Sequence, residues 1–112
     1  MTQNMTNDKT YPVPEAVRRA AVYALGLRKE YRRGGTAVGI ATARRLASEA
    51  RLPYSFVRKI SQYFPRHAGD NLRQRNPPSN GHIAWYLWGG YAGRRWSEAV
   101  VKKNEARKTR PR

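Results

Sequence analysis

The stretch ARRLASEARLPYSFVRKISQ, residues 43–62, has the apolar pattern of two helices separated by a short interruption. Apolar residues recur at helical spacing up to Ala50, and the same spacing resumes with Val57 and Ile60. Pro53 falls between the two segments, and a proline is well tolerated only in the first turn of a helix. The pattern therefore predicts one helix that ends near Ala50 and a second that begins just after Pro53.

A helix, a short turn and a second helix are the parts of the helix-turn-helix unit of DNA-binding proteins. If Val57 and Ile60 face inward, the second helix presents hydroxyls, cations and an amide outward, and such groups contact phosphates and base edges. The candidates for base contacts are Tyr54, Ser55, Arg58, Lys59 and Gln62. Arg51 occupies the place where many such turns carry Gly, so an ordinary helical hairpin with a solvated basic face is the alternative.

The charge of the chain favours a nucleic acid as partner. The 112 residues include 23 Lys and Arg against 7 Asp and Glu, which gives a formal net charge of +16. Such a field attracts polyanions, and the excess of Arg favours phosphate, which guanidinium binds with paired donors. A membrane is not an expected partner, because no long segment combines cations with a large apolar face.

The composition also restricts the place of action and the available chemistry. The chain has no Cys, which excludes disulfides and thiolate metal sites. No apolar run is long enough to cross a bilayer, and the polar start MTQNMTNDKT does not have the pattern of a signal peptide. We therefore expect the protein to work in a cytoplasm or inside a particle assembled there.

The apolar spacing predicts one compact, all-α domain of about five helices that contains the helix-turn-helix-like unit, with strand content near zero. We expect a disordered N-terminal tail over residues 1–12, a helical nucleic-acid-binding domain over 13–103 and a basic C-terminal tail over 104–112. Gly34 and Gly35 should end the first helix, and Thr36 should cap the second. The expected helices cover about residues 14–33, 36–50, 54–64, 81–88 and 92–103.

The remaining basic residues are candidates for supplementary phosphate contacts, although exposed charges that only keep the protein soluble are the simpler interpretation. The Gly-Gly segment before Thr36 is not a P-loop, because no Gly-Lys-Ser/Thr follows at the required spacing. Arg45 is more readily a structural cation, because Glu49 follows one helical turn later. The phosphate-contact candidates are Arg32, Arg33, Arg44, Arg51, Arg66, Arg73, Arg75, Arg94 and Arg95.

Two further sets of residues bear on function. His67, Asp70 and His82 suggest catalysis, but hydrolytic and metal sites usually need more acidic or imidazole groups, so we expect no enzyme activity, metal or cofactor. Aromatic residues beside Arg can stack on unpaired bases. We assign Trp88 and Trp96 to the core and leave Trp85 open between the two roles.

Three segments together resemble a small module of tailed bacteriophages. They are RRGGTAVGIATARRLA at residues 32–47, LPYSFVRKISQYFPRH at 52–67 and GHIAWYLWGGYAG at 81–93. The corresponding segments of the module are typically RGGTAVGVARARDL, TVRRM-SYFARHE and SAGRIAWLLWGGDAG. The resemblance implies a phage-encoded protein, and some copies of the module are fused to head-morphogenesis proteins.

Compared with that module, this chain has lost acidic residues and gained basic ones. Tyr91 stands where the module has Asp, and acidic residues that usually follow the position of His67 are replaced by AGDNLRQR. Pro53 replaces the usual Ser cap. The loss of acidic residues and the gain of cations suit a protein that binds a polyanion.

These observations favour a phage-encoded protein that binds double-stranded DNA in the host cytoplasm, associated with the nucleoid, or inside the virion. The alternative is a virion-structural, head-associated or DNA-packaging module that neutralises DNA or docks an acidic protein of the phage or host. The third hypothesis is RNA or single-strand binding, in which Trp85 and Tyr86 would be stacking platforms.

Overall fold

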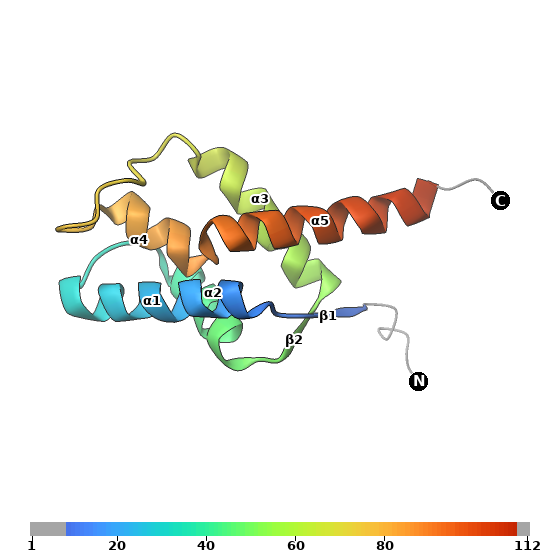
Figure 1. Ribbon diagram of the computed structural model, residues 1–112, viewed down its shortest axis with the longest axis horizontal. Helices are drawn as coiled ribbons and strands as arrows, with labels where there is room; N and C mark the ends of the chain where they lie inside the picture. Colours follow the sequence, from blue (N-terminus) through green and yellow to red (C-terminus); the bar gives the residue numbers. More distant parts are fainter. Residues whose placement is uncertain (1–8, 110–112) are drawn as a thin grey trace.

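The computed structural model describes residues 9–109, and this part of the chain forms five helices and one pair of short strands (Figure 1). The prediction of an all-α bundle of about five helices is confirmed. The elements are β1 (Thr10–Pro12), α1 (Glu15–Tyr31), α2 (Ala37–Ser48), β2 (Arg51–Pro53), α3 (Tyr54–His67), α4 (Asn80–Leu87) and α5 (Gly90–Thr109).

The helices enclose one apolar core. α1 packs against α2, α4 and α5, while α3 crosses α5 and makes its main contacts there (Figure 1). In α1, α2 and α3 the buried residues recur every three or four positions, so each of these helices buries one face. The short helix α4 buries Ile83, Trp85 and Leu87, which do not share one face. The fully buried members include Val17, Ala21, Ala24, Leu46, Val57, Ile60, Phe64, Ile83, Trp85 and Leu87.

The connector between α2 and α3 is more ordered than a simple turn. Its residues 51–53 form β2, which pairs antiparallel with β1, and Leu52 opposite Tyr11 is fully buried. Two flanking hydrogen bonds extend the pairing. The amide of Val13 donates to the carbonyl oxygen of Ala50 at 3.0 Å, and the amide of Tyr54 donates to that of Lys9 at 2.8 Å. The two helices therefore occur in the predicted order, but α3 packs on α5 rather than along α2.

Both expected tails are ordered where they join the helical domain. Residues 10–12, assigned to a disordered N-terminal tail, form β1, because the exposed backbone of β2 supplies hydrogen-bond partners. At the other end α5 continues to Thr109, so the start of the expected C-terminal tail is helical. Asn104 donates from Nδ2 to the hydroxyl of Tyr11 at 3.1 Å and joins the two ends. The rest of these tails, residues 1–8 and 110–112, lies outside the described residues.

α1 ends at Tyr31, earlier than the predicted stop at Gly34 and Gly35, because Arg32 takes the left-handed conformation (φ 56°) and its amide donates to Arg28. Gly34 and Gly35 follow this cap and allow a close approach to α4. Their φ angles are 97° and 76°, in the left-handed region that favours glycine. A Cβ at Gly34 would lie 2.6 Å from Cβ of Ile83, and one at Gly35 would overlap Leu87. The predicted cap is also present, because the hydroxyl of Thr36 accepts from the amide of Gly39 at 3.2 Å.

Arg18, half-buried on α1, closes the carboxyl end of α2. Its Nη1 donates to the carbonyl oxygens of Leu46 at 3.0 Å and Ala47 at 2.9 Å, and its Nη2 donates to that of Glu49 at 3.0 Å. The last carbonyls of a helix have no partner inside the helix, and their partial negative charge attracts a cation. One side chain therefore caps α2 and fixes it against α1.

We expect Arg18→Gln to lower the free energy of unfolding by about 2 kcal/mol, because hydrogen bonds to a charged group are lost and carbonyls are left unpaired. Arg19→Gln is the matched control, since Arg19 is exposed and lies 3.6 Å from Glu15. An exposed pair of this kind contributes less than about 1 kcal/mol. Urea unfolding of both variants measures the difference, and equal losses would contradict the capping role.

Arg45 and Glu49 form the predicted pair with two contacts. Nε of Arg45 lies 2.8 Å from Oε2, and Nη2 lies 3.1 Å from Oε1. The guanidinium carbon also lies 4.3 Å from the ring centroid of Phe56, so the pair links α2 to α3. The hydrogen bonds from Arg45 hold the pKa of the Glu49 carboxyl below its ordinary value.

This pKa shift predicts a pH-dependent contribution to stability. A carboxyl whose pKa is lower in the folded state stabilises the protein above its unfolded pKa, and the effect is lost as pH falls through the folded pKa. Glu49→Gln should therefore be less stable than the parent protein at neutral pH, and the difference should shrink as the pH falls below the ordinary pKa of a Glu carboxyl and then through the lowered one. Urea unfolding across this range measures it, and a constant difference would contradict the assignment.

Candidate nucleic-acid interface

The exposed face of α3 carries most of the candidates for base contacts. Val57, Ile60 and Phe64 turn inward and are fully buried, so the opposite side of the helix faces solvent. α3 contains no acidic residue. We call the exposed residues that share this side the α3 face: Ser55, Arg58, Lys59, Gln62 and Arg66.

Tyr54 lies apart from the α3 face. It is half-buried at the start of the helix, where its ring centroid is 6.3 Å from that of Tyr11. Its hydroxyl donates to Glu105 of α5 at 3.5 Å. Burial raises the pKa of the Tyr54 hydroxyl above its ordinary value, with a further contribution from the Glu105 carboxylate. The structure therefore groups four of the five base-contact candidates and places Tyr54 where the two ends of the domain meet.

Three of the phosphate-contact candidates are engaged within the protein. Arg33 donates from Nη2 to the carbonyl oxygen of Pro78 at 2.8 Å. Arg51 donates from Nε to the hydroxyl of Thr10 at 2.8 Å and from Nη2 to its carbonyl at 2.9 Å, which secures β1. Arg94 lies 3.1 Å from the carboxylate of Glu98. These contacts give each guanidinium a structural role whether or not it also meets a ligand.

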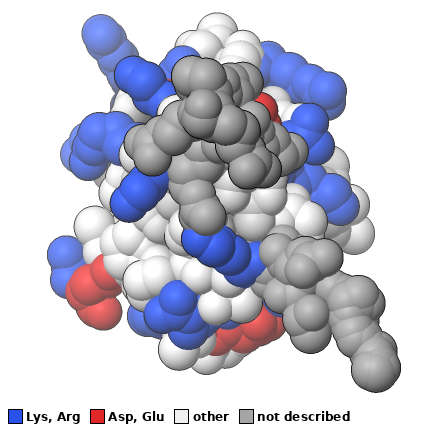
Figure 2. All heavy atoms as spheres, turned by 90° about the vertical axis from the view of Figure 1, so that its right-hand side faces the viewer, with Lys and Arg blue, Asp and Glu red and all other residues white. Residues whose placement is uncertain are grey.

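The other phosphate-contact candidates are exposed on separate parts of the surface. Arg66 belongs to the α3 face, and Arg44 lines a hollow of about 430 Å³ together with Arg28 and Lys29. Figure 2 shows basic side chains spread around the end of the molecule that it faces rather than gathered in one patch. The remaining exposed candidates are Arg32 after α1, Arg73 and Arg75 in the loop before α4, and Arg95 on α5.

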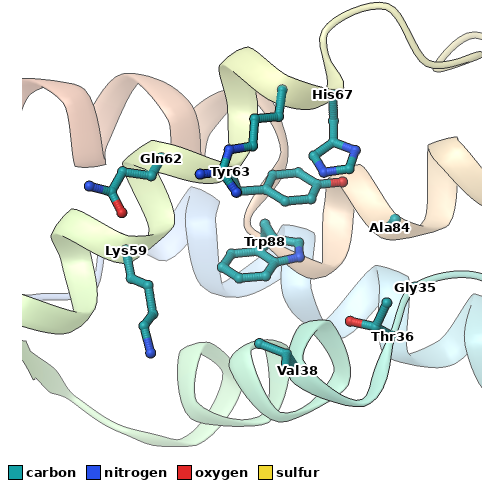
Figure 3. A pocket seen from close by; sticks show the side chains of 10 residues that line it. Gly35, Thr36, Val38, Lys59, Gln62, Tyr63, His67, Ala84 and Trp88 are labelled. Atoms are coloured by element: carbon teal, nitrogen blue, oxygen red, sulfur yellow. The ribbon is translucent and has the colours of Figure 1, made fainter.

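A pocket of about 320 Å³ adjoins the α3 face (Figure 3). It lies between α3 and the start of α2, with Trp88 from the end of α4 in its wall. Three residues of the α3 face, Lys59, Gln62 and Arg66, also line it. The complete lining is Gly35, Thr36, Val38, Lys59, Gln62, Tyr63, Arg66, His67, Ala84 and Trp88. Sequence reasoning missed this pocket because its residues come from three distant segments.

Stacked rings form one wall of the pocket. The ring of Tyr63 lies between that of Trp88, at a centroid distance of 4.6 Å and an angle of 6°, and that of His67, at 4.2 Å and 16°. The Tyr63 hydroxyl is buried and has no hydrogen-bond partner among the described residues. Burial raises its pKa, with a smaller contribution from Asp70. Tyr63 therefore stays neutral at physiological pH.

The aromatic residues considered for base stacking are buried or packed against the core. Trp85 is fully buried, so it cannot be the stacking platform of the single-strand hypothesis without unfolding. Tyr86 is half-buried, with its ring 5.4 Å from that of Tyr23. Trp88 and Trp96 are half-buried and packed against the core, as their assignment to it requires.

The two histidines have separate environments. His67 is exposed in part and lies 3.0 Å from the carboxylate of Asp70. His82 is buried, with Nδ1 2.7 Å from the carbonyl oxygen of Leu72 and Nε2 2.7 Å from the hydroxyl of Tyr23. Because the carbonyl can only accept, Nδ1 donates to Leu72, and Nε2 shares a hydrogen bond with the hydroxyl of Tyr23. His82 thus links α1, α4 and the loop before α4.

The part of the chain that the structure describes has neither a metal-binding cluster nor a membrane-spanning helix. Within residues 9–109, no group of three or more His, Cys, Asp and Glu side chains has an arrangement that could hold a metal ion. No helix in the same range is both long and apolar enough to span a membrane. Comparison of the chain with protein-family models, curated proteins and solved structures finds no match.

Proposed function

We propose that this protein is a phage-encoded, basic DNA-binding protein that contacts duplex DNA through the α3 face. The observation that supports this most strongly is the α3 face itself, which places Arg58, Lys59 and Arg66 on one exposed side of a helix without acidic residues. The phage origin rests on the resemblance of the three sequence segments.

The chemistry of the α3 face suits the major groove. An α-helix fits this groove, where Arg pairs with guanine and Gln with adenine through two hydrogen bonds. Arg58 and Gln62 lie one helical turn apart on the exposed side, so both can meet base edges while Lys59 and Arg66 meet phosphates. The buried side of α3 is anchored on α5, which holds the α3 face in a fixed orientation.

A binding role is preferred to catalysis. Within residues 9–109, no third His, Cys, Asp or Glu side chain joins the His67–Asp70 pair in a group that could hold a metal ion, and both ring nitrogens of His82 are engaged in structural hydrogen bonds. We therefore propose no enzyme activity and no cofactor, and we propose duplex DNA as the partner in the host cytoplasm or the virion.

The alternative function, a virion-structural or packaging module, is favoured by the wide spread of the cations (Figure 2). Charges that surround a protein neutralise phosphates without regard to base sequence, and such affinity falls steeply with salt. The two functions differ in one measurable respect, because only a rigid helix in the groove discriminates between base sequences.

Arg58→Ala should separate these functions, with Arg95→Ala as a control that removes the same charge from an exposed position of α5. The measurement is competition binding at fixed salt, with a duplex selected by the protein from random DNA and its scrambled counterpart. Arg58→Ala should reduce the preference for the selected duplex by about tenfold or more, because one paired base contact discriminates by roughly 1–3 kcal/mol. Arg95→Ala should lower both affinities alike.

If Arg58→Ala, like Arg95→Ala, lowers the affinities for the selected and the scrambled duplex equally, the α3 face does not distinguish bases. The packaging or DNA-coating function would then be the better account. If the parent protein has no affinity for any duplex at physiological salt, the proposed function is wrong.

A further inference from the structure

The pocket beside α3 joins three chemical features in one place. Its wall contains the stacked rings of Tyr63 and Trp88, and its rim carries the cations Lys59 and Arg66. Its third side is the start of α2, where Thr36 is the N-cap. In Figure 3, Lys59 extends from α3 toward α2, and the rings of Tyr63 and Trp88 lie between the two helices.

Each of these features matches one part of a nucleotide. Aromatic rings contact the flat face or edge of a base without requiring a particular sequence. Lys and Arg attract phosphate, and the first amides of a helix add unpaired donors and a positive dipole. Thr36 and Gln62 offer polar groups for the edge of a base. The volume of about 320 Å³ falls within the range of small-molecule sites.

We propose that this pocket binds one nucleotide, with its base against the wall of Tyr63 and Trp88 and its phosphate between Lys59, Arg66 and the start of α2. The hydroxyl of Tyr63 is buried within the wall, so the ring of this residue, not its hydroxyl, meets the base.

The nucleotide can come from two sources. It is either a free nucleotide or an unpaired nucleotide of a bound strand, and the second source rests on the proposed function. Lys59, Gln62 and Arg66 belong both to the α3 face and to the pocket, so a strand held on that face has an unpaired nucleotide within reach of the pocket. Unpaired bases cost less to extrude than paired ones, which would favour mismatches, bulges and strand ends.

Val38 offers a way to block the pocket with little damage to the fold. Its side chain lines the pocket, and the residue is 59% exposed. Val38→Trp adds bulk to the pocket, whereas Val38→Glu adds a carboxylate that suits the start of a helix but repels phosphate. Val22 is a matched control, since it is a helical valine with 54% exposure outside the pocket lining. The control variants are Val22→Trp and Val22→Glu.

The probes are 2-aminopurine deoxynucleoside monophosphate, a duplex with one unpaired 2-aminopurine and the same duplex fully paired. Fluorescence titrations measure their affinities, and thermal unfolding checks that each variant is folded. We expect the parent protein to bind either the free nucleotide or the unpaired duplex, the latter about tenfold more tightly than the paired duplex. Both Val38 variants should lose that binding or preference, and both Val22 variants should keep it.

The outcomes separate the pocket from the proposed function. Binding of the free nucleotide alone would identify a small-molecule site, and preference for the unpaired duplex would identify the strand as the source. If the parent shows neither, or if folded Val38 variants bind as the Val22 variants do, the proposal is overturned. If the parent protein binds neither duplex, the proposed function is contradicted. The titration with free nucleotide then still decides whether the pocket is a binding site.

Discussion

Arg18 donates three hydrogen bonds to the carboxyl end of α2, and the positions of β2 and α3 depend on that end. The capped end lies directly before the connector, where Ala50 accepts from Val13 and β2 pairs with β1. The connector in turn delivers the chain to α3. A cation on the first helix therefore helps to determine the direction in which the proposed DNA-contacting helix leaves the core.

The position of α3 separates a structural side from a solvent side. Its inward residues pack on α5, and its first residue meets both Tyr11 and Glu105, so the helix is fixed along its length and at its start. Because α3 packs on α5 rather than along α2, space remains between α2 and α3 for the pocket of Tyr63 and Trp88. The same departure from a simple helical hairpin thus creates both the α3 face and the pocket next to it.

Local patterns in the sequence were sufficient for the helices, for the Thr36 cap and for the Arg45–Glu49 pair, because these depend on residues within about one turn of each other. Long-range partners were not predictable in this way. Arg18 looks like an exposed cation by periodicity, and its acceptors are about thirty residues away. Likewise, nothing near residues 10–12 indicates that β2 will pair with them. The pocket could not be predicted either, because it is defined by the relative positions of α2, α3 and Trp88 in the folded structure.

We propose that the α3 face is the main surface that meets duplex DNA. Titration of isotope-labelled protein with a short duplex, followed through the backbone amide resonances, tests it directly. We expect the largest shifts at Ser55, Arg58, Lys59 and Gln62, with smaller shifts at exposed cations elsewhere. Shifts spread evenly over α1, α2 and α5, with none concentrated on α3, would contradict it.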